Sequence, residues 1–591
     1  MYKIVYKYCL RSPNMRKFLP LFLAAVALAP LGGCTANLVR GSSVATAGAP
    51  YDVVISNGKI VDGTGASWFW GDLAISNGRI VRIAPRGLLA AVPATRRIDA
   101  KGMVVAPGFI DIQAQSYENF MVGDGKAISM VTQGITTAIL GEGDTPAPVN
   151  TKMLASMTDT TQRKLVSQFT GDHGFGRWLD FMGSRGLSQN VGSFVGSGTV
   201  RQWGKGFATG EATATELEAM QAMVRHAMED GAFGIASALI YPPNSYSSTH
   251  ELIETAKAMA PYGGVYITHM RNEGDEFLEA LDEAIRVGKE GGVPVEVYHL
   301  KAAGPGNWPK MALAIAKIDS ARRAGQDVQA DMYLYVAGGN GFNACIAPKY
   351  AADGKLLENL ANPATRELIK ADLHRKMPGF DNLCITGGPE NVMVTGFTRP
   401  ELKQYEGKRL SEISAAMHKD WADVIIELNI AEKATLGEIL FLMSEDNLRM
   451  QIAQPWMKFG TDAGSEDPAT AQGMTHPRGY GNYPRLFGKY VRDEKVVPLE
   501  DAVRKASAAV ATRLQLHDRG VLKEGMRADV VVFDAATIRD IATFEKPHQL
   551  SVGMQYVLVN GIEVIRDGAH TGAKPGQVVR GAAWTGWSSP K

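Results

Sequence analysis

Residues 264–299 read GVYITHMRNEGDEFLEALDEAIRVGKEGGVPVEVYH, and this pattern is the clearest indication of the fold class. The apolar runs at its two ends predict buried strands, and the amphipathic, charged stretch 276–290 between them predicts a helix. A strand, a helix and a second strand in this order favour two parallel neighbours in one sheet. His269 and His299 follow the two strands, so both imidazoles are expected at the same edge of that sheet.

The alternation of strands and helices extends in both directions, over residues 106–520. This region is long enough for a closed barrel, so the fold class we predict is α/β, a TIM-like (β/α)8 barrel. The expected helices are 215–230, 250–260, 276–290 and 310–324, and the expected strands are 264–268, 293–298, 326–334 and 457–460.

Three further segments complete the predicted organisation. Short apolar runs with Asn-Gly turns at 57–58, 77–78 and 560–561 recur near both ends of the chain, which is typical of hairpins. Residues 51–105 and 521–591, the latter including a C-terminal tail, are therefore expected to build one small β-sandwich together. Residues 341–450 interrupt the barrel pattern, and we expect an inserted, mostly helical segment that covers or shapes the pocket.

The composition is that of a large soluble enzyme, with 591 residues, a formal net charge of +1 and 45% hydrophobic residues. Near-neutral charge argues against a nucleic-acid partner. The N-terminus has a basic start and an apolar run that ends in Leu31-Gly32-Gly33-Cys34, which resembles a bacterial lipobox. We expect a lipoprotein signal peptide over 1–33, a lipidated Cys34 and a flexible tether over 34–50.

This N-terminus predicts an exported bacterial lipoprotein of the cell envelope, bound to the membrane through its lipid anchor. In a host with two membranes the protein would face the periplasm from the outer membrane. A plain signal peptide with an incidental cysteine is the alternative.

Four side chains form a metal-hydrolase pattern, because each follows a predicted strand. His269, His299 and Glu142 make a three-ligand set with a fourth position open to water, as in catalytic zinc sites. Asp462 follows the last predicted barrel strand, where a carboxylate can act as general base and then general acid. On the residues alone, Glu142 is equally consistent with a solvated loop glutamate, and Asp462 is also consistent with a helix cap.

The segment after Pro107-Gly108-Phe109-Ile110-Asp111 departs from the usual metal pattern. A His-x-His pair on one strand face would supply two imidazoles to a cation, but here Gln113 and Gln115 supply amides, which bind zinc poorly. The expectation is therefore one tightly bound Zn²⁺ rather than two metals. The two amides remain available as polar replacements that hydrogen-bond water or the substrate.

The ordered motifs resemble those of the amidohydrolase superfamily, specifically the N-acyl-D-amino-acid deacylases, over essentially all of the mature sequence. The resemblance implies that His269 and His299 hold zinc, that Glu142 replaces a cysteine ligand, and that Asp462 is the catalytic acid–base. Some deacetylases of this superfamily have a single zinc site made of one glutamate and two histidines. This resemblance implies that one metal ion is sufficient for activity. The matching motifs are 107–111, 133–137, 231–235, 239–243, 269–273, 299–304, 330–333, 476–481 and 571–576.

The same resemblance implies a carboxylate clamp made of Lys301, Tyr333 and Arg478. A serine of the family pattern is replaced by Gly339, which leaves the side-chain preference open. The implied activity is zinc-dependent hydrolysis of a small-molecule N-acyl amino acid, with the D-series favoured. The alternatives are hydrolysis of another amide, such as a cyclic amide or a dipeptide, and a non-catalytic binding protein on a decayed scaffold.

Two cysteines, Cys345 and Cys384, remain in the part of the chain expected to fold. They lack metal-ligand spacing and are interpreted as structural. Sequence alone does not decide whether they pair, because pairing depends on their geometry.

Overall fold

The computed structural model describes residues 50–586. The predicted signal peptide, Cys34 and all but the last residue of the predicted tether lie outside this range. Within it, no helix has both the length and the apolar character needed to cross a membrane.

Two parallel sheets form the barrel, one of three strands (β6-β7-β8) and one of six (β17-β13-β12-β11-β10-β9). Only Phe194 separates β8 from β9, so these two strands join the sheets at one seam. At the other seam the Asp462 N–H donates to the Gln113 carbonyl at 2.8 Å, and Ala114 forms a parallel bridge with Ala463. The strands are β6 (Phe109–Asp111), β7 (Ile135–Leu140), β8 (Asn190–Ser193), β9 (Val195–Gly196), β10 (Gly234–Ala238), β11 (Val265–His269), β12 (Val295–Val297), β13 (Val328–Met332) and β17 (Met457–Phe459).

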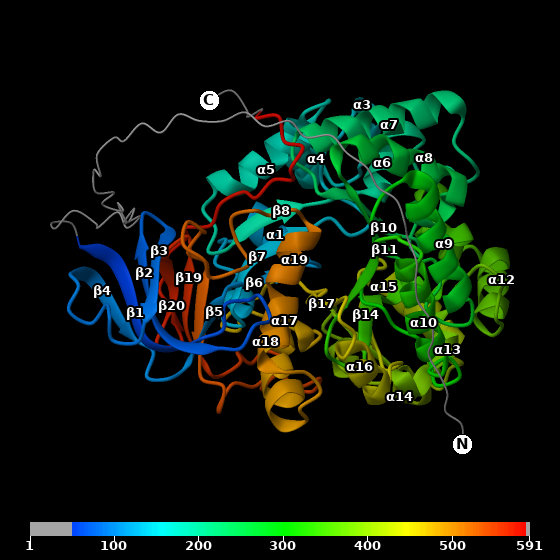
Figure 1. Cartoon of the computed structure of the whole chain (residues 1–591). Helices are drawn as coiled ribbons and strands as arrows, with labels where there is room; N and C mark the ends of the chain where they lie inside the picture. Colours follow the sequence, from blue (N-terminus) through cyan, green and yellow to red (C-terminus); the bar gives the residue numbers. More distant parts are fainter. Residues whose placement is uncertain (1–49, 587–591) are drawn as a thin grey trace, which may run out of the picture. The chain divides into compact units, whose positions relative to one another are not determined.

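The predicted barrel helices are present and cover the outside of the strands (Figure 1). Helix α9 buries Phe277, Leu281 and Ala284, whose spacing places them on one face. The helices expected from the sequence are α7 (Ala214–Glu229), α8 (Thr249–Met259), α9 (Phe277–Gly291) and α10 (Lys310–Arg323). The others around the barrel are α1 (Tyr117–Met121), α2 (Ile128–Val131), α3 (Thr151–Ser156), α4 (Thr160–Val166), α5 (Gly174–Ser184), α6 (Ser197–Gly204), α16 (Glu445–Ile452), α17 (Arg478–Arg485), α18 (Leu499–Ala506) and α19 (Ala508–Arg513).

The two terminal segments meet in one nine-stranded sheet, in which β5 pairs with β1 on one side and with β18 on the other. Figure 1 shows the blue N-terminal strands beside the orange and red C-terminal ones. The combination of a barrel with a β unit built from both ends confirms the predicted fold class. The strands are β1 (Tyr51–Ile60), β2 (Phe69–Ser76), β3 (Arg79–Pro85), β4 (Ala94–Asp99), β5 (Val104–Pro107), β18 (Val530–Phe533), β19 (Met554–Val559), β20 (Ile562–Arg566) and β21 (Ala569–His570).

One predicted turn in this sheet is wrong. Asn77-Gly78 and Asn560-Gly561 connect consecutive strands, but Asn57-Gly58 lies inside β1 as an irregularity between Ile55 and Gly58. The first part of β1 pairs with β4 and the last part with β5, so the strand shifts from one partner to another. A Cβ on Gly58 would lie 2.5 Å from Val105 Cγ2, so only glycine allows this close approach.

The insertion contains strands that the sequence did not indicate. Its short antiparallel sheet has the order β14-β16-β15 and contributes to the wall of the pocket described below. Helices nevertheless make up more of the segment, as predicted. Strand β14 (Gly338–Gly341) leads into the segment, whose other elements are α11 (Leu356–Ala361), α12 (Pro363–Leu373), α13 (Leu383–Gly387), β15 (Val392–Thr395), α14 (Leu410–Met417), α15 (Trp421–Ala431) and β16 (Gly437–Leu440).

A disulfide links Cys345 with Cys384 inside this insertion, with a Cα–Cα distance of 5.5 Å. The pairing that the sequence left open is therefore present in the structure. It ties the segment after β14 to helix α13.

Candidate metal centre and active site

The predicted metal ligands and the predicted acid–base residue lie at the carboxyl ends of barrel strands, around a cavity of about 520 Å³. Gln115, Lys301, Tyr333 and Arg478 also line this cavity, whereas Gln113 does not. His269 is the last residue of β11, and Glu142, His299 and Asp462 follow β7, β12 and β17. His299 and Asp462 adopt positive φ angles of 32° and 48°, which non-glycine residues seldom do. Such strain concentrates where a fold must aim a functional side chain.

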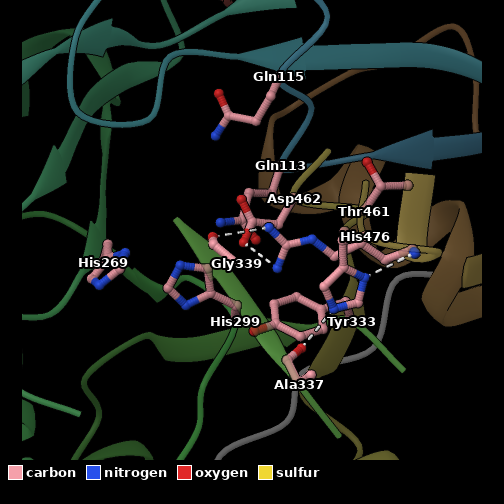
Figure 2. A network of polar contacts seen from close by, with 12 residues as sticks. Gln113, Gln115, His269, His299, Tyr333, Ala337, Gly339, Thr461, Asp462 and His476 are labelled. Carbon is pink, nitrogen blue, oxygen red and sulfur yellow. Dashed lines mark hydrogen bonds and ion pairs between the residues drawn. The ribbon is translucent and has the colours of Figure 1, made fainter. Parts of the chain in front are cut away.

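Glu142, His269 and His299 converge on one point. Glu142 Oε1 lies 3.2 Å from His269 Nδ1 and 3.3 Å from His299 Nε2, and the ligand atoms of the three residues all lie within 4.8 Å of one another. Figure 2 shows the two imidazoles beside one another. One carboxylate oxygen and two imidazole nitrogens are donors that zinc uses, so this set fits a zinc ion.

Gln113 and Gln115 both bind the other oxygen of Glu142. Each side-chain amide donates to Glu142 Oε2 at 2.7 Å. Oε1 is thereby left facing the imidazoles. At the positions expected for a His-x-His pair, the chain thus places two amide donors that bind Glu142.

Glu273 is a residue of this centre that the sequence analysis did not single out, although it belongs to the quoted motif 269–273. One of its carboxylate oxygens, Oε1, lies 3.2 Å from His299 Nδ1 and 2.5 Å from Lys301 Nζ. Its other oxygen lies 3.7 Å from His269 Nε2. A carboxylate behind metal-binding imidazoles fixes their orientation, and no residue spacing reveals such a contact.

The insertion holds Glu273 in place. Asp381, which precedes α13, accepts hydrogen bonds from the backbone N–H groups of Glu273 and Gly274 at 2.6 and 3.1 Å. Burial raises the pKa of Asp381 to about 7, against the opposing effect of these hydrogen bonds. The inserted segment therefore supports the imidazoles indirectly as well as lining the pocket.

Asp462 and the predicted clamp form a second cluster on the same cavity. Asp462 Oδ2 lies 2.8 Å from Arg478 Nη1, and the Arg478 guanidinium lies 4.4 Å from the centre of the Tyr333 ring. Arg478 Nε has no hydrogen-bond partner among the described residues, so it can still donate to a ligand. Lys301 Nζ lies 5.8 Å from the centre of the same ring.

His476, also missed from the sequence, orients the arginine. It accepts a hydrogen bond from the Arg478 backbone N–H at 3.0 Å on Nδ1 and donates from Nε2 to the Ala337 carbonyl at 2.8 Å (Figure 2). Burial and the adjacent arginine hold the pKa of His476 well below its ordinary value, so the ring is neutral. The side chain that accompanies Arg478 in His-Pro-Arg is thus a structural support.

The fold and the donor set define a metal-dependent hydrolase of the (β/α)8-barrel class. Residues 438–565 match the model of the amidohydrolase family. The chain is 32% identical over 534 residues to the D-aminoacylase of Alcaligenes xylosoxydans xylosoxydans, covering 90% of this chain and 98% of that one. It therefore belongs to the D-aminoacylase family of amidohydrolases.

Two solved structures extend this result. An N-acyl-D-glutamate deacylase from Bordetella bronchiseptica, complexed with zinc and a phosphonate mimic of the tetrahedral intermediate, shows 30% identity and a TM-score of 0.73. A D-aminoacylase described as having a binuclear metal centre, with one-metal activation and second-metal attenuation, shows 32% identity and a TM-score of 0.72. Each alignment covers 90% of this chain and the whole of the other. The chain is thus an amidohydrolase enzyme with a metal site.

Proposed function

We propose that the protein hydrolyses the amide bond of N-acyl-D-amino acids with one zinc ion held by Glu142, His269 and His299. The observation that carries this proposal is the convergence of these three side chains while both glutamine amides bind Glu142 Oε2. The names of the related D-aminoacylase and N-acyl-D-glutamate deacylase support the substrate class.

A bound zinc ion supplies a Lewis acid that polarises the scissile carbonyl and lowers the pKa of water. Asp462 removes a proton from the attacking water and later gives it to the leaving amine nitrogen. Arg478 keeps the Asp462 carboxylate in place through their 2.8 Å ion pair. With Lys301 and Tyr333, Arg478 also forms the site for the α-carboxylate of the substrate, since cationic donors bind a carboxylate strongly.

Metal analysis and turnover test this proposal together. The purified protein should retain one zinc per chain after dialysis, lose activity with a chelator and regain it with one equivalent of zinc. It should release acetate from N-acetyl-D-amino acids and leave the L-enantiomers intact. Two tightly held metals would refute the single-ion centre, and absence of turnover with every D-substrate would refute the activity.

We also propose that the protein is exported and anchored to the cell envelope through a lipid on Cys34. The support is the Leu31–Cys34 sequence after an apolar run. Labelling cells with a radioactive fatty acid should mark the wild type and not Cys34→Ser. Equal labelling of both forms would contradict the anchor.

A further inference from the structure

The buried carboxyl group of Glu438, on β16, receives no hydrogen bond from residues 50–586, the part of the chain that the structure describes. Its Oε1 has no partner among the described residues. Its Oε2 lies 3.3 Å from Cys345 Sγ and 3.2 Å from Cys384 Sγ. Because these sulfurs form a disulfide, neither carries a hydrogen to donate. Both oxygens of Glu438 are therefore unsatisfied.

Within residues 50–586, no cationic side chain compensates this group. Among the described residues, no lysine, arginine or histidine forms an ion pair with Glu438, which is 2% exposed. Burial alone therefore raises the pKa of Glu438 well above its ordinary value. A buried polar group without a hydrogen-bond partner destabilises a fold, so its presence calls for a ligand or another role.

Asn340 places a second unsatisfied acceptor beside the first. It lies directly across from Glu438 in the β14–β16 ladder, and its buried Oδ1 also lacks a hydrogen-bond partner in the described part of the chain. Both residues line the 520 Å³ cavity that contains the metal ligands. Tyr241 lines the same cavity and packs against His269 with 5.7 Å between ring centres, so the metal centre and this acceptor pair border one cavity.

We propose that Glu438 and Asn340 form the subsite for the substrate's side chain, and that this subsite takes a side chain ending in an ammonium or guanidinium group. This inference rests on the proposed deacylase function. A cationic N–H donor would satisfy both acceptors and neutralise the carboxylate of Glu438. The preferred substrates are then N-acyl derivatives of basic D-amino acids.

Other side chains fit this subsite poorly. An apolar side chain would leave the two acceptors unpaired, and sites built for hydrogen bonding reject such analogues. An acidic substrate side chain would lie beside the carboxyl group of Glu438, which has no cationic partner among the described residues, and would therefore bind poorly. Discrimination between basic and apolar substrates is therefore built into β14 and β16.

A comparison of substrates whose side chains have similar lengths tests the inference. The kcat/KM of the full-length protein is measured for Nα-acetyl-D-lysine, N-acetyl-D-norleucine and N-acetyl-D-glutamate. The variants are Glu438→Gln, which removes the charge at constant shape, and Glu401→Gln, a control that removes an exposed charge from the same insertion. Zinc content and thermal unfolding verify that each variant is folded.

The wild type should favour lysine over norleucine by about 10- to 100-fold, as expected for one buried charged hydrogen-bond site. Glu438→Gln should reduce this ratio at least about fivefold, and Glu401→Gln should leave it unchanged. Turnover of norleucine or glutamate at least equal to that of lysine, with the same ratio in Glu438→Gln, would overturn the inference while the deacylase function stands. Absence of turnover with all three substrates would remove the proposed function and the inference with it.

Discussion

At the scale of single residues, the metal centre depends on what surrounds the three ligands. The sequence indicated Glu142, His269, His299 and Asp462 because each follows a strand, and the structure brings the first three together. The hydrogen bonds from the two glutamines to Glu142 and the contacts of Glu273 could not be predicted from the sequence. They depend on which way side chains turn after the barrel closes, and no spacing in the chain encodes that direction.

Restoring imidazoles at the glutamine positions should create a second metal site. In Gln113→His/Gln115→His, two alternate residues again face the Glu142 carboxylate, which can bridge two cations once its amide partners are gone. We expect metal content to rise from one toward two zinc ions per chain, measured by elemental analysis after dialysis. An exposed control, Gln168→His, should stay at one, and an unchanged metal content in the double variant would show that the amides do not exclude the second ion.

At the scale of elements, periodicity predicted the barrel helices well and the insertion poorly. Helices α7 to α10 begin and end within one or two residues of the predicted bounds, because a long amphipathic pattern identifies them. Strand β14 consists of Gly338-Gly339-Asn340-Gly341, which has neither apolar alternation nor branched side chains. It forms a strand because β16 supplies its hydrogen-bond partners, and that partner lies about a hundred residues further along the chain.

The disulfide in this insertion should stabilise it strongly. Cys345 and Cys384 are 39 residues apart, and closing a loop of that length lowers the entropy of the unfolded chain enough to stabilise the fold by about 4 kcal/mol. Cys345→Ala/Cys384→Ala should therefore shift unfolding by urea to lower concentration, and reduction of the wild type should reproduce the shift. If the wild type unfolds identically with and without reductant, the bond contributes no stability.

At the scale of the whole molecule, the contacts between the ends of β6 and β17 close the barrel and also position the proposed catalytic residues. Asp111, at the end of β6, accepts hydrogen bonds from the Thr461 N–H at 2.9 Å, the Thr461 hydroxyl at 2.5 Å and the Gln113 N–H at 3.1 Å. The same seam carries the Asp462 N–H bond to the Gln113 carbonyl. Asp111 therefore contacts Gln113 directly and Thr461, the residue that precedes Asp462, so its carboxylate holds both segments of the proposed site in place relative to each other.

Loss of this carboxylate should weaken stability and metal binding together. Asp111→Ala leaves three buried donors unpaired, which we expect to cost about 3 kcal/mol or more in the free energy of unfolding. Because Gln113 would lose its anchor, zinc affinity should fall in the same variant, as measured by competition with a chromogenic chelator. Thr461→Ser, which keeps the hydroxyl, is the matched control and should retain both properties. The contacts of Asp111 are expected both to close the barrel and to support the metal centre. An Asp111→Ala protein that lost stability but kept wild-type zinc affinity would show that barrel closure and metal binding are independent.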